Sequence, residues 1–300
     1  MGALDGKVVV VTGAGQGIGR EEALACARAG AAVVVDDLAG AADTAAAVTT
    51  AGGRALALEH DVGDFEAAGR LVAAATDTFG GLDGLVNNAG VVRDRMVFNL
   101  TPEEFDLVVR VNLGATFAMT RHAAAWWKGQ GRPGAIVNTT STSGILGNLG
   151  QSNYGAAKAG VAAFTVICAL ELARYGVRVN AIAPGARTRM TEGAFGQLDF
   201  GGEFDPLDPA NVAPAAVWLL SDAAAEVSGQ VIGITGGLVE LYEGWHVVAS
   251  QEAPGRWTPE ELAASAPRLF GNRPTRAPWR PSSLRRMIEA ARRGDQEEMR

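Results

Sequence analysis

The sequence predicts an α/β protein built on a single doubly wound parallel sheet of the Rossmann type, with a C-terminal extension. Short apolar runs, several of them continuous and β-branched, alternate with longer Ala-rich helical patterns up to about residue 240. Such runs are typical of parallel strands that helices cover on both faces. A glycine-rich turn joins the first strand to the first helix. We therefore predict one domain over residues 1–240 and an extension over residues 241–300.

The predicted strands are short and the predicted helices between them are longer. The strands are Lys7–Thr12, Ala32–Asp36, Arg54–Glu59, Leu82–Asn87, Ala135–Thr140, Val177–Ile182 and a final strand and turn at Gln230–Gly237. The helices include Ile18–Ala29, Asp64–Phe79, one that begins at Thr101 and one that runs from Ser152 to about Tyr175. A helix start is indicated by a Thr N-cap, then Pro, then two acids near the positive end of the dipole. This pattern occurs at Thr101 and again at Thr258.

Composition excludes several classes of protein. Hydrophobic residues make up 48% of the chain, enough for a sizeable core, and the net charge of −7 argues against a nucleic-acid surface. Cys26 and Cys168 are expected to be buried free thiols in a reducing cytosol, with a disulfide as the alternative. No signal peptide is indicated at the N-terminus, and no apolar run approaches the ~20 residues that span a bilayer. We therefore expect a soluble, cytoplasmic protein with no nucleic-acid or membrane partner.

The turn at Thr12–Gly19 has the spacing T-G-x-x-x-G-x-G between the first strand and the first helix. Glycines let the backbone approach a pyrophosphate, and the helix N-terminus behind them supplies amides and a favourable dipole. The turn therefore predicts a dinucleotide site, with a merely flexible turn as the alternative. The candidate cofactor residues within it are Gly13, Gln16, Gly17, Ile18 and Gly19.

Two carboxylates, Asp36 and Asp37, stand where the second strand ends. A carboxylate at this position can accept both hydroxyls of an adenosine ribose and would repel a 2′-phosphate. The nearest base, Arg20, is expected on the helix. The pair therefore favours NAD over NADP. Only one of the two can face the ribose, so we assign that contact to Asp37 and expect Asp36 to be a solvated charge.

Three motifs, taken in order and spacing over about residues 5–240, resemble the classical short-chain dehydrogenase/reductase (SDR) family. They are the glycine turn at Thr12–Gly19, Asn87-Asn88-Ala89-Gly90 after the fourth strand, and Tyr154-x-x-x-Lys158. More narrowly, Gly147–Gln151, Arg189-Met190-Thr191 and the long extension look like the (3R)-hydroxyacyl-CoA dehydrogenase unit of peroxisomal multifunctional enzymes.

Tyr154 and Lys158 lie four residues apart and therefore on one face of a helix. A free phenol has a pKa of ~10, and a nearby ammonium is expected to lower it toward the range that suits a general acid/base. Lysine is rare here, at Lys7, Lys128 and Lys158 only, because the chain otherwise uses arginine. A lysine at this position therefore indicates a catalytic pair, and the resemblance adds a hydrogen bond from it to the nicotinamide ribose.

The resemblance completes the catalytic set with Ser141 and Asn112. Ser141 stands thirteen positions before Tyr154, where the family has its substrate-orienting hydroxyl; Thr140, Thr142 and Ser143 are competitors. Asn112 matches a helix asparagine that holds a water near the lysine. The predicted catalytic residues are therefore Asn112, Ser141, Tyr154 and Lys158.

The remaining cofactor contacts also follow from the resemblance. Asn88, Ala89 and Gly90 are expected beside the adenosine ribose, and Asp61 and Val62 beside the adenine ring. Pro184 and Gly185 would turn the chain under the nicotinamide. Thr188 is the candidate partner of the carboxamide, although the spacing departs from the common family pattern by one residue. The three histidines form no ligand spacing, so no metal is predicted.

The set predicts an NAD-dependent enzyme that interconverts a secondary alcohol and a ketone. The alternative within this class is an NADPH-dependent 3-oxoacyl-ACP reductase, which the Asp36-Asp37 pair disfavours. A dinucleotide-sensing regulator is the non-enzyme alternative, but it would not need Ser141, Tyr154 and Lys158 together. The segment Met190–Asp205, where the family has its substrate lid, is rich in Gly and Phe. It suits a 3-hydroxyacyl-CoA or a steroid or terpenoid alcohol equally.

The resemblance also implies a homodimer or homotetramer assembled through the helices at Thr101–Lys128 and Ser152–Tyr175. The extension contains Trp245, Trp257, Phe270 and Trp279, and such side chains favour burial. We expect residues 240–280 to pack on the body or on a neighbouring subunit. From Arg268 onward, nine arginines stand against four acids. This basic stretch either meets an anionic part of the substrate, such as a CoA phosphate, or is a solvated tail.

Overall fold

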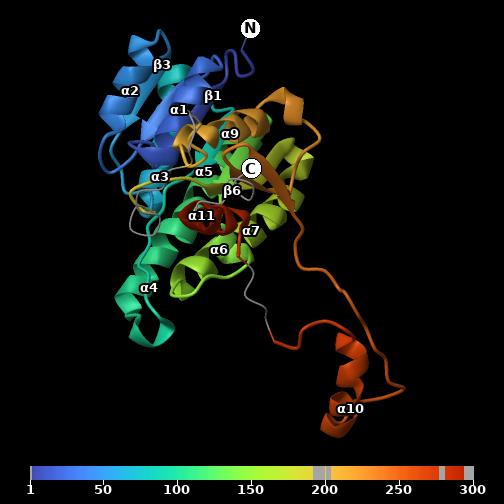
Figure 1. The fold of residues 1–300 in the computed structure, drawn as a ribbon. Coiled ribbons are helices and arrows are strands. Elements are labelled where there is room, and N and C mark those ends of the chain that lie inside the picture. Colours follow the sequence, from blue (N-terminus) through green and yellow to red (C-terminus); the bar gives the residue numbers. More distant parts are fainter. Residues whose placement is uncertain (1, 192–199, 201–203, 277–280, 294–300) are drawn as a thin grey trace. The chain divides into compact units, whose positions relative to one another are not determined.

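Seven parallel strands and one antiparallel strand form a single sheet in the described part of the chain, which comprises residues 2–191, 200, 204–276 and 281–293 of a computed structural model (Figure 1). The strand order is β3-β2-β1-β4-β5-β6-β7-β8. The bounds are β1 Val8–Thr12, β2 Ala32–Asp36, β3 Arg54–Leu58, β4 Gly84–Asn87, β5 Gly134–Thr139, β6 Val177–Gly185, β7 Val231–Thr235 and β8 Leu238–Tyr242. The chain crosses from β3 over β1 to β4, so the sheet is doubly wound, as predicted.

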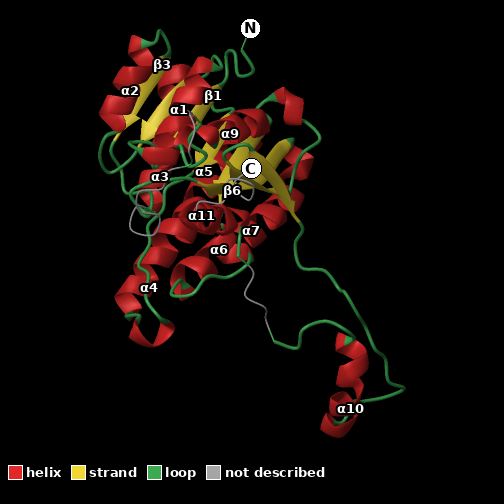
Figure 2. Cartoon of the chain, in the orientation of Figure 1, coloured by secondary structure: helices red, strands yellow, loops and turns green. Residues whose placement is uncertain are grey.

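Helices cover both faces of this sheet and create two separate cores (Figure 2). Val9 and Val11 of β1 point into one core, and Val8 and Val10 point into the other, because side chains alternate along a strand. The first core is closed by α1 (Gly17–Arg28), α2 (Ala41–Thr50) and α9 (Ala213–Leu220). The second is closed by α3 (Phe65–Phe79), α5 (Ala115–Gln130) and α7 (Ser152–Leu172). Cys26 and Cys168 are free, buried and divided between the two cores.

Both predicted helix starts carry a complete capping box. At α4 (Pro102–Val109), the Thr101 Oγ1 accepts the Glu104 amide, and the Glu104 carboxylate accepts the Thr101 amide. Thr258 and Glu261 form the same pair at α10 (Pro259–Phe270). After α4 the helix continues through a π-helical segment, Arg110–Gly114, directly into α5. The predictions at Thr101 and Thr258 are thus confirmed, whereas the π-helical segment was not predicted.

Strand β8 was also missed, because the predicted sheet ended with the strand and turn at Gln230–Gly237. It runs antiparallel to β7 at the sheet edge, with Thr235 opposite Leu238 and Val231 opposite Tyr242. Leu238, Val239 and Leu241 are exposed, so this edge strand lacks the buried run that marks the central strands. The chain therefore forms a closing strand first and the extension afterwards.

Helix α7 contradicts the expectation that no apolar run approaches membrane-spanning length. Together with the short helix Ala173–Tyr175 it spans 24 residues, and an 18-residue window within it has a mean hydropathy of 1.7, so it is long and apolar enough to cross a membrane. One face packs on the sheet through Val161, Thr165 and Cys168. Val166, Ile167 and Leu170 are exposed on the outside. The packed face identifies α7 as a core helix of the α/β domain.

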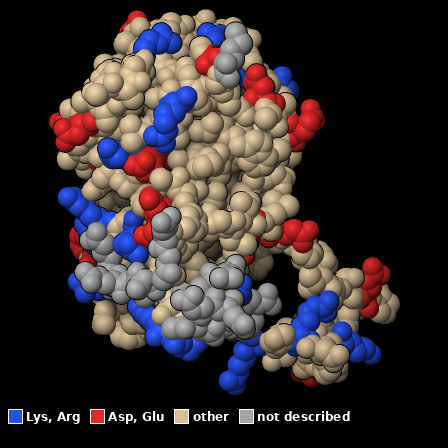
Figure 3. All heavy atoms as spheres, turned by 45° about the horizontal axis from the view of Figure 1, so that its top comes forward, with Lys and Arg blue, Asp and Glu red and all other residues tan. Residues whose placement is uncertain are grey.

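The chain divides into two compact units. One comprises Met1–Tyr242 with Pro281–Arg300 and includes the sheet and α11 (Ser283–Arg293); the other is Glu243–Arg280 and contains α10. Within the smaller unit, Gln251 donates to the Ser265 carbonyl and Arg273 donates to the Val248 carbonyl. The packing of the predicted extension on the body or on a neighbouring subunit stays a prediction. On the larger unit, Figure 3 shows mixed charges over the upper part of the view and basic side chains gathered at the lower left.

Candidate active site at the carboxyl edge of the sheet

The turn between β1 and α1 needs glycine at specific positions. Gly13 and Gly17 have φ angles of +64° and +57°, a region that residues with a Cβ rarely adopt. A Cβ on Gly13 would lie 2.7 Å from the Ala89 Cα, so the turn runs directly against the chain that follows β4. The T-G-x-x-x-G-x-G pattern therefore corresponds to a constrained turn.

Asn88 holds this turn in place. Its Nδ2 donates to the carbonyls of Thr12 (3.1 Å) and Gly13 (3.0 Å), while the Thr12 Oγ1 accepts the amides of Asn88 and Ala89. Gln16 is the N-cap of α1, and its side chain makes no capping hydrogen bond.

The start of α1 fits a dinucleotide. Because Gln16 does not cap the helix, its side chain leaves the first-turn amides of Gly17, Ile18 and Gly19 without a capping acceptor. Uncapped amides at the positive end of a helix suit a pyrophosphate. These residues, with Gly13 and Gln16, would hold that part of the cofactor.

The structure separates the roles of Asp36 and Asp37. Asp36 is only 1% exposed and accepts the His60 amide at 3.2 Å, so the expectation of a solvated charge is wrong. Burial raises the pKa of Asp36 to about 7, and the nearby carboxylates of Asp37 and Asp61 add to this. Asp37 is partly exposed and accepts the Gly15 amide at 2.9 Å. Asp37 is therefore the carboxylate beside the glycine turn.

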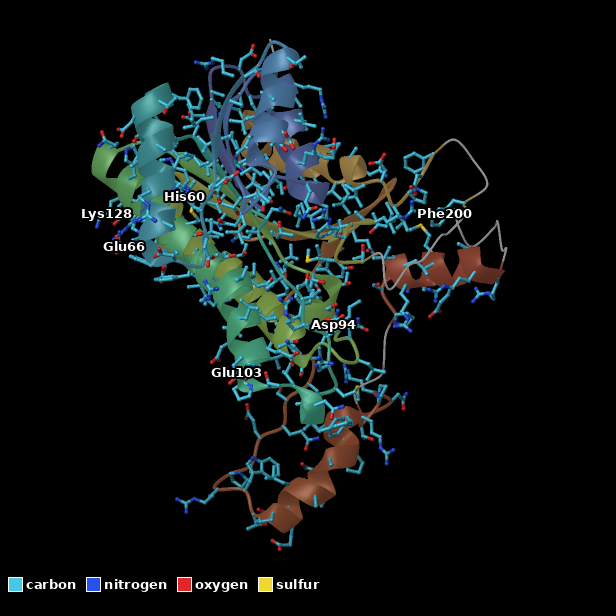
Figure 4. The ribbon with its side chains drawn as sticks, turned by 90° about the vertical axis from the view of Figure 1, so that its left-hand side faces the viewer. His60, Glu66, Asp94, Glu103, Lys128 and Phe200 are labelled. Atoms are coloured by element: carbon cyan, nitrogen blue, oxygen red, sulfur yellow. The ribbon has the colours of Figure 1, made fainter. Side chains whose placement is uncertain are left out.

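Asp61 and Val62 lie beyond the end of β3, in the same part of the molecule as His60 (Figure 4). The Asp61 Oδ1 accepts the Gly63 amide at 2.9 Å, and its Oδ2 pairs with Arg110 at 2.9 Å. Val62 is buried in the core formed by α3 and α5. Asp61 is thereby linked to the first residue of the π-helical segment that carries Asn112.

Ser141 lies next to Tyr154, although it is not at the end of a strand. β5 ends at Thr139, and Ser141 is instead the N-cap of the short helix α6 (Thr142–Ile145), where its Oγ accepts the Ser143 amide. Its side chain also hydrogen-bonds Tyr154. The competitor Thr140 is buried and donates to the Lys158 carbonyl at 2.6 Å, which binds α7 to the sheet. Ser141 is therefore the hydroxyl that accompanies the tyrosine.

Lys158, Asn112 and Gly90 converge at one point. The buried Lys158 Nζ donates to the Thr139 carbonyl at 2.7 Å and lies 5.7 Å from the centre of the Tyr154 ring. The Asn112 Nδ2 donates to the carbonyls of Val91 and Val108, whereas its buried Oδ1 has no partner among the described residues. A Cβ on Gly90 would lie 2.6 Å from that Oδ1 and 3.6 Å from the Lys158 Nζ. This unsatisfied acceptor is available for a water or a cofactor hydroxyl.

Burial opposes the expected effect of Lys158 on the pKa of Tyr154. Burial raises the pKa of Tyr154 to about 12, a hydrogen bond with Ser141 acts in the opposite direction, and the Asp94 carboxylate raises it further. Burial also lowers the pKa of Lys158 to about 7. The same burial disfavours charge on both groups, and the sequence spacing alone does not contain this information.

Two contacts hold the loop after β4 against the start of α7. The Gln151 Nε2 donates to the Asp94 Oδ2 at 2.8 Å, and the Asn153 Nδ2 donates to the Arg93 carbonyl at 2.9 Å. Asp94 lies in this loop, near α6 and α7 (Figure 4). The loop therefore lies against the start of α7, next to Tyr154.

Pro184 and Gly185 end β6, where Gly185 packs on the Thr235 side chain. The Thr188 amide donates to the Thr191 Oγ1 at 2.7 Å. The Thr188 methyl lies 3.5 Å from where a Cβ on Gly17 would be, so Thr188 faces the glycine turn. This position suits the predicted carboxamide contact despite the shifted spacing. Most of the predicted lid, residues 192–199 and 201–203, lies outside the described residues.

Three supporting residues were missed in the sequence. Thr12 connects the glycine turn to Asn88, Thr139 provides the carbonyl for Lys158, and Thr191 orients Thr188. Thr12 belongs to the motif, so its position was a usable signal. Thr139 acts through its backbone, which no residue type reveals.

The predicted residues thus gather at the carboxyl edge of the parallel sheet, where ligands of doubly wound proteins bind. Asn112, Ser141, Tyr154 and Lys158 lie together, and Asp37, Asn88 and Thr188 surround the glycine turn. A family model described as short chain dehydrogenase matches residues 7–197, more than half of the chain. The chain belongs to the short-chain dehydrogenase family. Enzymes of this family act on CH–OH groups with a nicotinamide dinucleotide, and the same holds for this one.

Individual relatives of this short-chain dehydrogenase give more detail. A hydroxyacyl-CoA dehydrogenase, ChsB1, from Mycobacterium tuberculosis is 45% identical over 90% of both chains. Mouse peroxisomal multifunctional enzyme type 2 is 41% identical over 80% of this chain and 32% of its own. A 3-oxoacyl-[acyl-carrier-protein] reductase from Synechocystis is 40% identical over 80% of this chain and 99% of its own. The crystal structure of a short chain dehydrogenase from Mycobacterium avium, 46% identical, matches 94% of this chain and all of that chain with a TM-score of 0.86. The predicted resemblance to the hydroxyacyl-CoA dehydrogenase unit is thereby confirmed.

Proposed function

We propose that this short-chain dehydrogenase interconverts a 3-hydroxyacyl-CoA and the corresponding 3-oxoacyl-CoA with NAD as its cofactor. When bound, the nicotinamide supplies or accepts the hydride. Tyr154 accepts the hydroxyl proton during oxidation and returns it during reduction, and Ser141 orients the substrate oxygen through a hydrogen bond. Lys158 binds the nicotinamide ribose and, when protonated, stabilises the Tyr154 phenolate. Asn112 accepts a hydrogen bond from a water that connects to Lys158.

The observation that carries the substrate class is the extent of the similarity. The match to the mycobacterial hydroxyacyl-CoA dehydrogenase covers 90% of this chain, so it continues beyond Tyr242 into the extension. The match to the 3-oxoacyl-[acyl-carrier-protein] reductase covers 80% of this chain while using 99% of that protein. At least part of the extension is therefore shared with a hydroxyacyl-CoA dehydrogenase, which supports a CoA thioester.

The choice of NAD is supported by the charges around the glycine turn. Asp37 lies against Gly15, where a ribose 2′-phosphate would meet a negative charge. Arg20, the nearest base in the sequence, pairs with Glu21 at 2.6 Å. Asp37 therefore favours a cofactor with a free 2′-hydroxyl. Arg20 is already paired with Glu21, so its charge is partly neutralised and it is less suited to bind a 2′-phosphate.

A substrate panel tests the proposal. Purified enzyme is assayed with NAD and NADP against 3-hydroxyacyl-CoA thioesters, steroid and terpenoid alcohols, and 3-oxoacyl-ACP in the reducing direction. We expect the highest kcat/KM with a 3-hydroxyacyl-CoA and NAD, by about tenfold or more over NADP. Asp37→Ala should narrow the cofactor difference. Equal use of both cofactors, or a preference for NADPH and acyl-ACP, would favour the reductase alternative.

Assembly and location complete the proposal. We expect a homodimer or homotetramer through α4, α5 and α7, which is supported by exposed apolar side chains on these helices, including Phe105, Phe117, Ile167 and Leu170. Light scattering of the purified protein gives the subunit number. A cytoplasmic location is also proposed, and fractionation of the producing cells tests it.

A further inference from the structure

Helix α11 is fastened to the larger unit by its apolar face. Leu284, Met287 and Ile288 form a small cluster with Phe200 and Leu207, and Figure 4 labels Phe200 beside this helix. At its first residue, the Ser283 Oγ donates to the Glu240 Oε1 on β8 at 2.6 Å. The helix is therefore packed on the protein body rather than being a solvated tail.

One partner of α11, Leu207, is bonded to the segment that directly follows β6. The Leu207 carbonyl accepts the Arg187 amide at 2.7 Å, and Arg187 directly precedes Thr188. Arg187 also pairs with Asp205 at 3.1 Å, two residues before Leu207. Helix α11 thus packs on Phe200 and Leu207, two described residues that follow β6 in the chain.

The outer face of α11 is basic. Arg285, Arg286, Arg292 and Arg293 are exposed, and Glu289 is the one acid in the helix. Glu289 pairs with Arg285 at 3.0 Å, while Arg286 donates to the neutral oxygens of Ser283 and Pro281. The chain as a whole, by contrast, has a net charge of −7.

We propose that the arginines of α11 bind the phosphates of coenzyme A. This inference rests on the proposed function. The acyl group of such a substrate is joined through its pantetheine arm to a nucleotide with several negative charges. The planar guanidinium donates two parallel hydrogen bonds to a phosphate, which an ammonium does not. The helix therefore supplies the positive surface that an acidic protein needs for a polyanionic substrate.

An acidic carrier protein would also suit a basic helix, but the observations favour CoA. The carrier-protein reductase from Synechocystis matches 80% of this chain with nearly all of its own length, so most of the extension has no counterpart there. The hydroxyacyl-CoA dehydrogenase matches 90% of this chain, which includes at least part of the segment after Tyr242.

Binding of free coenzyme A to the full-length protein tests the site independently of turnover. Arg286 and Arg293 are seven residues apart and share a side of the helix. Calorimetry should give a Kd about tenfold weaker for Arg286→Gln/Arg293→Gln than for the wild type, and added salt should weaken wild-type binding. The matched control is Arg70→Gln on α3, whose side chain is 57% exposed, and its Kd should change less than about twofold.

Kinetics separates a phosphate site from a structural role. The double variant should lose about tenfold more kcat/KM with a 3-hydroxyacyl-CoA than with the same acyl group on N-acetylcysteamine, which has no phosphate. Equal losses on both thioesters would overturn the proposal and indicate that the arginines only hold the substrate segment. The proposal would also be overturned if the double variant bound CoA as tightly as the wild type does, or if it lost activity with acyl-ACP substrates only. If the wild type binds CoA through α11 but oxidises neither thioester, the proposed function fails and the CoA site stands.

Discussion

The two sides of the active site are held by different forces. On the nucleotide side, Asn88 and Thr12 hold the glycine turn through four hydrogen bonds, and Asp37 adds another to Gly15. On the substrate side, the chain after β6 depends on the Arg187–Asp205 pair, one backbone bond to Leu207 and the apolar contacts of α11. Directional bonds define one geometry, whereas apolar packing tolerates substitution. Cofactor binding and substrate selection should therefore respond to different mutations.

The largest effect is expected at the catalytic residue that meets both sides. Tyr154→Phe keeps the ring but removes the proton path, so kcat should fall by at least about 10²-fold. The Kd for NADH, measured by fluorescence, should stay within about twofold because the nucleotide side is intact. Turnover close to that of the wild type would show that Tyr154 does not handle the proton.

A second prediction concerns the buried carboxyl under the nucleotide side. Glu22 on α1 is fully buried, neither carboxyl oxygen has a partner among the described residues, and burial raises its pKa from the usual 4.5 to about 8. The folded state therefore binds the proton more tightly than the unfolded state, and stability should fall as the pH rises from about 4.5 through about 8.

Glu22→Gln removes this dependence. The pKa shift limits the destabilisation by Glu22 at high pH to at most about 5 kcal/mol, and relaxation around the buried group makes it smaller. We therefore expect Glu22→Gln to raise the free energy of unfolding by about 2 kcal/mol at pH 8. Little gain is expected at pH 5. Urea titrations at both pH values measure it, with Glu21→Gln, on the same helix and partly exposed, as the control. A gain of equal size at both pH values would contradict the assignment.

The hydrogen bonds of Asn88 give the third prediction. Asn88→Ala removes two bonds to the glycine turn, each worth about 1 kcal/mol, so the Kd for NADH should rise about tenfold. At saturating cofactor, kcat should change little. Asn148→Ala, on the substrate side and bonded to Gln151, is the control. The comparison between the two sides would break down if both variants weakened NADH binding equally.

The smallest effect is expected on the substrate side. Ile288→Ala removes part of the apolar contact between α11 and Leu207 and should raise the substrate KM by about threefold to fivefold. The affinity for NADH should stay unchanged in this variant. Steady-state kinetics with NAD saturating separates the two quantities, and a loss of NADH affinity would show that α11 supports the whole domain.

Sequence patterns predicted what depends on short-range order. The strand runs, the capping boxes at Thr101 and Thr258 and the Tyr154–Lys158 pair each depend on spacing within a few residues. The features that were missed depend on burial in the tertiary structure, which local sequence patterns do not show. Asp36 is enclosed rather than solvated, and burial disfavours charge on both Tyr154 and Lys158. β8 and α11 are exposed on one side, so neither shows the continuous apolar run of the central strands.

The π-helical segment Arg110–Gly114 sets the helical phase of everything that follows it. A π-helical turn contains one more residue than an α-helical turn, so α4 and α5 are out of phase by about 100° relative to one uninterrupted α-helix. Asn112 is inside this segment, and its bonds to Val91 and Val108 depend on that offset. Deleting a single residue here would restore a regular helix and rotate α4 against α5. The length of this helix is therefore as constrained as its composition, and a family alignment should tolerate substitutions in it more readily than gaps.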